Sequence, residues 1–208
     1  MQGNFVNKAF NLPLRPDEYH DIRAEIFHRL EKELPAHLTY HTAGHTKKVV
    51  ELTGLLSEEE GLSDSEIQLL LIAAVFHDTG FLVSPIDHEE ISVKIFREYD
   101  LPLEEEEKLK IDRYIRATRI GAPLTSREEY IITDADLFYL GTDGYLPISD
   151  QLRKEWENLG NHFTDKQWFD LQVRFMENHK FRTRSAQLLF GPKKSENLLF
   201  LKRSVQPQ

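Results

Sequence analysis

Cysteine is absent from the 208 residues of this chain. Its absence excludes disulfides, thiolate nucleophiles and cysteine-ligated zinc sites. The nine histidines are then the natural nitrogen ligands for a metal ion.

Long apolar segments are also missing. The longest unbroken apolar run, Leu69–Phe76, has 8 residues, whereas a membrane-spanning helix needs about 20. The segment Met1–Arg15 lacks the basic stretch followed by an apolar one that marks a secretory signal. We therefore expect a cytoplasmic protein that does not associate with membranes.

Positive charge is the third scarce feature. The chain has 26 Lys and Arg against 35 Asp and Glu, a net charge of −9. General nucleic-acid binding needs a basic surface and is not expected here. A small phosphorylated substrate is still possible, because local Lys and Arg residues can line a pocket. A hydrophobic content of 40% is ordinary for a globular chain and predicts one domain around one core.

Helical periodicity dominates the sequence, and alternating strand patterns are nearly absent, so the predicted fold class is all-α. Pro16-Asp17 opens a helix to about Leu34, and the next begins near His41 or Thr42. Ser63 and Glu66 fit a capping box that starts a third helix. Later helices are expected over the ranges His88–Tyr99, Leu103–Thr118, Ser126–Leu140, Gln151–Leu159, Thr164–Asn178 and Lys193–Arg203.

The pair His77-Asp78 follows the apolar run directly. Ile67, Leu70 and Ala74 form an apolar stripe of helical period, and His77 and Asp78 occupy its next two positions. Burying an imidazole beside a carboxylate is costly unless something pairs with both. A metal cation would do so. Alternatively, His77 ends the helix and Asp78 caps it.

A second His-Asp pair, His20-Asp21, shows that the dipeptide alone does not indicate a metal site. It lies in a helix rich in charged residues rather than at the end of an apolar stretch. We therefore interpret it as solvated surface.

The segment Tyr40–His45 contains two histidines four residues apart. On a helix, His41 and His45 share one face, and His45 continues toward Val49 and Leu52 on the apolar side. Both histidines could bind one metal, or one could bind metal while the other faces the substrate. An ordinary helix start with surface histidines is the plain alternative.

Two carboxylates interrupt the apolar run that ends near Leu140. Asp134 and Asp136 are two residues apart and cannot share a helix face. Each aligns with apolar neighbours, so periodicity does not choose between them.

In this order, these elements resemble the HD-domain superfamily of metal-dependent phosphohydrolases, and the resemblance implies a compact helical bundle. It implies a divalent metal ion (Mn, Mg, Zn, Fe or Co) held by the residues His45, His77, Asp78 and Asp136. Tyr40–His45 is similar to the Tyr-His-x-x-x-His element of cyclic-nucleotide phosphodiesterases, which makes His41 the general acid. Asp136 is preferred over Asp134 because Ala135-Asp136-Leu137 resembles the family's Ala-Asp-Leu element. The matched core covers about 40–141 of a single domain over 1–208, with a helical extension over about 145–203.

The chain departs from members of the superfamily that hold two metals. Those members supply extra histidines between the His-Asp pair and the last Asp. Here His88 is a possible ligand of a second site, but Thr118 stands where another His is expected. The expectation is therefore one tightly held metal.

The implied reaction is hydrolysis of a small, nucleotide-like phosphoester by metal-activated water, in which Asp78 also orients the nucleophile. Positive charge must meet the phosphoryl oxygens, and Lys48 and Arg116 are the candidates. Two other functions stay open: a non-catalytic module that senses nucleotides or binds a partner, and a dinuclear-iron oxygenase.

Overall fold

The computed structural model describes residues 12–205, and within them the chain is helical with no strand. The predicted all-α class is therefore confirmed. Residues 1–11, which carry most of the segment judged to lack a secretory signal, lie outside the described part. The elements are α1 (Pro16–Glu33), α2 (Ala43–Glu59), α3 (Asp64–Phe76), η1 (Thr79–Leu82), α4 (His88–Glu98), α5 (Glu105–Ala117), α6 (Arg127–Asp136), η2 (Phe138–Gly141), α7 (Tyr145–Asn158), α8 (Asp165–Asn178) and α9 (Arg184–Val205).

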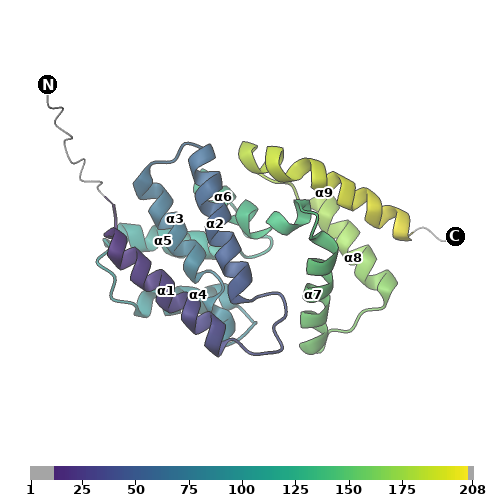
Figure 1. The fold of residues 1–208 in the computed structure, drawn as a ribbon, viewed down its shortest axis with the longest axis horizontal. Coiled ribbons are helices and arrows are strands. Elements are labelled where there is room, and N and C mark those ends of the chain that lie inside the picture. The colour runs from purple at the N-terminus through teal and green to yellow at the C-terminus, as the bar shows by residue number, and fades with distance from the viewer. Residues whose placement is uncertain (1–11, 206–208) are drawn as a thin grey trace, which may run out of the picture.

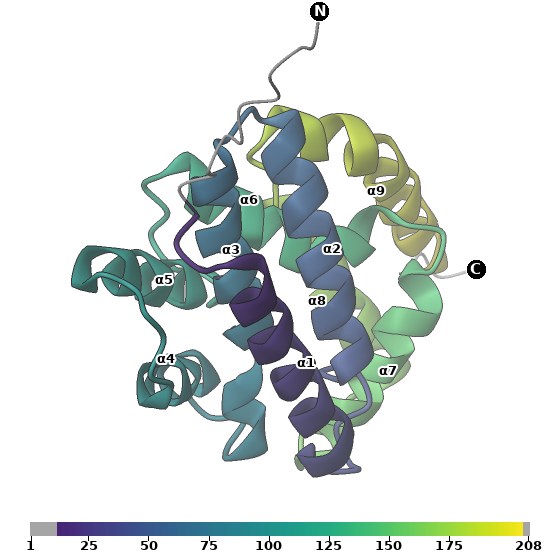
Figure 2. The same ribbon diagram turned by 60° about the vertical axis from the view of Figure 1, so that its left-hand side comes forward.

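Helices α1–α6 gather on one side of the molecule, and α7–α9 pack together at its other end (Figure 1). Helix α3 is central, because it packs against α1, α2, α4 and α5. Helices α1 and α2 lie side by side across one face of the bundle (Figure 2). Helix α9 runs along α8 and η2 and so joins the two ends.

The central position of α3 follows from its sequence. Ser63 and Glu66 form the predicted capping box at its start, and its apolar side chains are buried nearly all round. The segment Asp64–Leu82 is apolar and long enough to cross a membrane, but 72% of its apolar window is buried inside the fold. It is a core segment, and it carries His77 and Asp78 just beyond the last helical residue, Phe76.

Three helix boundaries differ from the prediction. Helix α6 ends at Asp136 rather than Leu140, and a 3-10 turn follows. Helix α7 begins at Tyr145 rather than Gln151, because proline is tolerated in a first helical turn. Helix α9 begins at Arg184 rather than Lys193 and continues through Pro192. Core packing explains this last difference, since α9 has buried side chains both before and after the proline.

Candidate metal centre

The first candidate ligand is placed by the start of α2. Thr42 caps the helix, and its Oγ1 accepts the backbone N–H of His45 at 3.4 Å. His45 lies on the buried side of α2, and its Nε2 points to two carboxylates, Asp78 and Asp136. The expectation that His45 continues the apolar stripe is therefore met.

The end of α3 places the second and third candidates. Nδ1 of His77 lies 2.8 Å from the carbonyl oxygen of Ala74. A carbonyl only accepts, so Nδ1 carries the proton and Nε2 is left as a lone-pair donor. Ser92 fixes the following turn, because its Oγ donates to the carbonyl of His77 at 2.6 Å and accepts the N–H of Gly80 at 2.8 Å.

Gly80 is required at this turn. A Cβ at this position would lie 1.9 Å from the backbone oxygen of His88, a distance that no side chain tolerates. The absence of a side chain lets η1 pack directly on the start of α4. This close approach brings His88 to the site, with its Nε2 3.6 Å from Oδ1 of Asp78.

The end of α6 shows which of the two aspartates faces the site, a choice that helical periodicity leaves open. Asp136 points to the histidines. Asp134 instead accepts the N–H groups of Arg182 and Thr183 at 2.9 and 2.7 Å, and the hydroxyl of Thr183 at 2.8 Å. Asp134 therefore anchors the segment before α9, and Asp136 faces the site.

The four predicted ligands come together. Nε2 of His45 lies 3.0 Å from Oδ1 of Asp136 and 3.6 Å from Oδ2 of Asp78. Nε2 of His77 lies 3.2 Å from the same Oδ2 and 3.7 Å from the same Oδ1. The donor atoms of His45, His77 and Asp78 all lie within 4.8 Å of one another, an arrangement that can hold a metal ion.

Two atoms at the centre of this cluster are unsatisfied. Nε2 of His77 and Oδ2 of Asp78 are buried and have no hydrogen-bond partner. Buried polar atoms left in this way are costly. A set of two imidazole nitrogens and two carboxylate oxygens suits a divalent transition metal, and such an ion would satisfy both atoms. The residues therefore fit a metal ion.

The charge state of the carboxylates suits the same role. Burial would raise the pKa of Asp78, but the nearby histidines, His77 first, hold it well below its ordinary value. Burial opposes ionisation of Asp136 too, but the nearby His45 and His77 lower its pKa. Both side chains are therefore anionic ligands at neutral pH.

His41 lies beside the cluster and has a partner that the sequence did not indicate. Its Nδ1 contacts Oε1 of Glu155, and Oε2 of Glu155 accepts the backbone N–H groups of Tyr40 and His41 at 2.8 and 3.0 Å. Burial lowers the pKa of His41, but the hydrogen bond to Glu155 and the nearby aspartates outweigh it, so the pKa is raised. Glu155 is 114 residues away in sequence, and it sits in a run of charged residues that gives no signal of this role.

These groups open into a cavity of about 400 Å³. His41, Asp78, His88 and Asp136 line its polar end. The opposite wall comes from α7 and α8 and is largely apolar, with the residues Leu152, Trp156, Leu171 and Phe175. The C-terminal helices therefore shape the pocket.

The two predicted phosphate contacts lie elsewhere. Among the described residues, those that line this cavity include no Lys or Arg. Lys48 pairs with Glu51 at 2.7 Å and Arg116 with Glu90 at 2.9 Å, both at the surface. This corrects the prediction, which rested on proximity in sequence to the candidate ligands and not on the direction of the side chains.

A second metal site has only a partial ligand set. His88 lies near Asp78 and 3.6 Å from Oε1 of the buried Glu89. Thr118 lines the cavity, but its hydroxyl donates to the carbonyl of Ile115 in its own helix at 2.8 Å. The other His-Asp pair, at positions 20 and 21, is exposed on α1.

The family-model comparison matches residues 42–139 to the HD domain, a range that contains all four candidate ligands. A comparison with curated proteins finds no significant match.

Solved structures share the fold over most of the chain. A predicted HD superfamily hydrolase from an uncultured Thermotogales bacterium is 19% identical, with 91% of each chain covered and a TM-score of 0.55. A Lactobacillus plantarum protein is 15% identical, with 88% of this chain and 94% of that chain covered and a TM-score of 0.63. A Listeria innocua protein is 19% identical, with 88% and 96% covered and a TM-score of 0.57. The family match identifies residues 42–139 as an HD domain, and the solved structures share the fold around it.

Proposed function

We propose that this protein is a metal-dependent phosphohydrolase that cleaves a small phosphoester with water. The match to the HD domain supports a metal-dependent hydrolase. One observation carries the proposal: the converging His45, His77, Asp78 and Asp136 leave two buried ligand atoms unsatisfied at the end of a cavity. When bound there, a divalent ion lowers the pKa of water from about 15.7 towards 7 and polarises a phosphoryl oxygen.

The protein's own residues would complete the reaction. His41 is the proton donor for the leaving oxygen, because Nδ1 is held by Glu155 and Nε2 is left for the substrate. Glu155 acts through His41 as a positioning residue. It fixes the ring through one carboxylate oxygen and the adjacent backbone through the other.

The cavity suggests the kind of substrate. Its wall on α7 and α8 is apolar and aromatic, which suits a nucleobase or similar ring stacked near Trp156 and Phe175. With no Lys or Arg among the described lining residues, the metal and the histidines must balance the phosphoryl charge. This favours a single phosphate group, as in a nucleoside monophosphate or a cyclic nucleotide, over a triphosphate.

The test is a substrate panel run on the purified full chain. Phosphomonoesters and phosphodiesters of nucleosides are assayed with Mn, Mg, Zn, Fe and Co in turn, with Asp136→Ala as the matched inactive control. We expect turnover of at least one single-phosphate substrate with at least one metal, and none in the control. No turnover across the panel, or equal turnover in the control, would count against the proposal.

Metal analysis separates the other functions. About one metal per chain fits the hydrolase, two irons per chain fit an oxygenase, and no metal fits a non-catalytic module.

A further inference from the structure

A second cavity lies next to the one at the metal centre. Its volume is about 300 Å³, which is at the lower end of the range typical of small-molecule sites. It shares three wall residues with the metal-centre cavity, namely Ile120, Leu137 and Phe175. None of the candidate metal ligands lines it, so it is a separate site.

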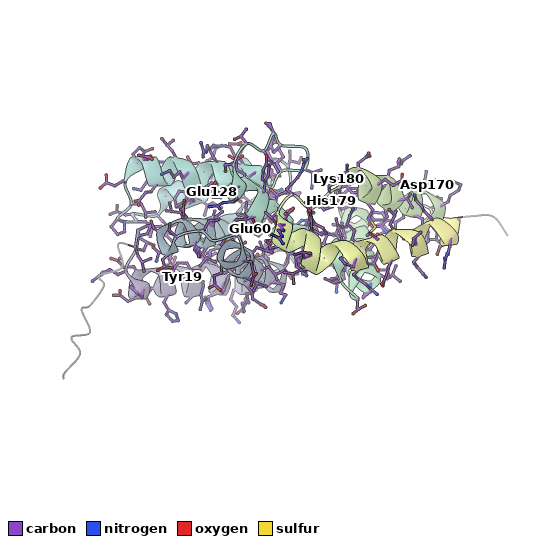
Figure 3. All side chains as sticks on the ribbon, turned by 90° about the horizontal axis from the view of Figure 1, so that it is seen from above. Tyr19, Glu60, Glu128, Asp170, His179 and Lys180 are labelled. Atoms are coloured by element: carbon purple, nitrogen blue, oxygen red, sulfur yellow. The ribbon has the colours of Figure 1, made fainter. Side chains whose placement is uncertain are left out.

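One side of this cavity is apolar and the other is cationic. The apolar wall comes from α5 and the loop after it, with the residues Ala117, Ile120, Ala122 and Leu124. The cationic wall runs from Asn178, the last residue of α8, to Arg182 before α9, and it carries Lys180 and Arg182. His179 and Lys180 lie at the junction between the two groups of helices (Figure 3).

The two cations on this wall lack an ion-pair partner among the described residues. Over residues 12–205, the side chains of Lys180 and Arg182 form no ion pair and no hydrogen bond, although the chain has an excess of acidic residues. Arg119, the third cation of the lining, is already paired with Asp87 at 3.1 Å and Glu89 at 3.3 Å.

Asp134, the one buried carboxylate that lines this cavity, forms no ion pair with Lys180 or Arg182. Asp134 is 1% exposed, and its oxygens accept the backbone N–H groups of Arg182 and Thr183 and the Thr183 hydroxyl. These bonds hold the segment in place while the side chain of Arg182 stays free. A further polar group is unsatisfied at this wall, since Nδ1 of His179 is buried without a partner.

We propose that this cavity is a second ligand site, for a small organic anion with an apolar body. The apolar side would pack against the body of the ligand, and Lys180 and Arg182 would bind its anionic group through charge-assisted hydrogen bonds. The site is distinct from the metal centre and does not depend on the proposed hydrolase activity.

The test is an NMR titration of the full chain, loaded with Mg²⁺, with naphthalene-2-sulfonate as the probe. Its sulfonate is a weak metal ligand, and its ring system supplies the apolar body. We expect saturable shifts of the methyl signals of Ala117, Ala122 and Leu124. Shifts confined to Leu152 and Leu171, which line only the metal-centre cavity, would overturn the proposal.

Two variants separate charge from cavity. The double variant Lys180→Ala/Arg182→Ala should weaken binding by about tenfold or more, while its matched control, Lys154→Ala/Arg174→Ala, should stay within about twofold. The control removes one exposed Lys and one exposed Arg that line neither cavity. Ala122→Phe keeps both cations but fills the cavity, and it should abolish binding.

Thermal unfolding shows whether each variant is folded. The neutral probe naphthalene-2-sulfonamide should bind at least about tenfold more weakly than the sulfonate. Unchanged affinity in the Lys180/Arg182 variant, or equal affinity for both probes, would overturn the anion site. Full binding by folded Ala122→Phe would show that the cavity is not used.

Discussion

Glu155 of α7 binds the segment that precedes α2 at three points: it contacts Nδ1 of His41 and accepts the backbone N–H groups of Tyr40 and His41. The side chain of Glu155 is 1% exposed and that of His41 is 19% exposed. This contact joins the C-terminal helices to the edge of the metal centre. It also sets the tautomer of His41, since a carboxylate accepts the proton on Nδ1.

The first prediction separates the general acid from the metal ligands. His41→Ala should keep its metal, because the four candidate ligands stay in place and Nδ1 of His41 is held by Glu155. It should lose roughly 10²-fold or more in kcat on substrates with poor leaving groups. A nitrophenyl ester needs little protonation and should be affected much less. If His41→Ala is purified without metal, His41 is itself a ligand and the acid lies elsewhere.

The second prediction concerns Glu155 and the pH profile. The proton donor must be protonated, so activity should fall as pH rises through the raised pKa of His41. Glu155→Gln removes the charge that raises this pKa, and the alkaline fall should move to lower pH with metal content unchanged. The measurement is kcat against pH for both proteins. An unmoved alkaline limb would show that Glu155 does not act through His41.

The third prediction uses the same pair for stability. The pKa of Glu155 is lowered by His41 against the effect of burial, so its contribution is present above pH 4.5 and is lost as pH falls through the folded-state pKa. The pKa of His41 is raised, so its contribution is present below pH 6.5 and is lost as pH rises through the folded-state pKa. In metal-free protein, Glu155→Gln should therefore lower the free energy of unfolding most between pH 4.5 and pH 6.5, by roughly 2–3 kcal/mol. Urea unfolding at a series of pH values measures this difference, and a pH-independent cost would contradict the assignment.

The fourth prediction compares the two His-Asp pairs. His77→Ala and Asp78→Ala should each lose the metal and all activity, because both residues supply central ligand atoms. The double variant His20→Ala/Asp21→Ala alters exposed residues of α1 and should change stability by less than about 0.5 kcal/mol. Metal content by mass spectrometry and turnover are measured for all three. Similar losses of metal and turnover from both pairs would contradict the interpretation that only His77 and Asp78 belong to the metal site.

The fifth prediction compares the two aspartates of α6. Asp134→Ala leaves the part-buried N–H of Arg182 and the buried N–H of Thr183 without their acceptor and should lower the free energy of unfolding by about 2–4 kcal/mol. Its metal content should stay normal at temperatures where it is folded. Asp136→Ala should do the reverse, with loss of metal and a smaller loss of stability. Calorimetry and metal analysis on both variants give the comparison, and metal loss in folded Asp134→Ala would argue against the assignment.

Local spacing explains why some features could be predicted and others could not. The capping box of Ser63 and Glu66 involves residues three apart, and it forms as predicted. Helix α9 was predicted too short because Pro192 is unfavourable in a helix by local rules, whereas buried side chains on both sides of it keep the helix intact. The position of Lys48 and Arg116 in the chain predicts that they bind phosphate, but in the fold each forms an ion pair with an acidic side chain at the surface.

By itself, the sequence determined the helical class and the polar residues that interrupt its apolar helix faces, because helix formation and facial periodicity depend on neighbours within a few residues. It therefore indicated His45, His77 and Asp78 as residues facing the core. Only the tertiary structure decided that Asp136 rather than Asp134 points to them, and that Glu155 holds His41 from 114 residues away. Both outcomes depend on how separate helices pack against each other, and the spacing of residues within one helix does not determine that packing.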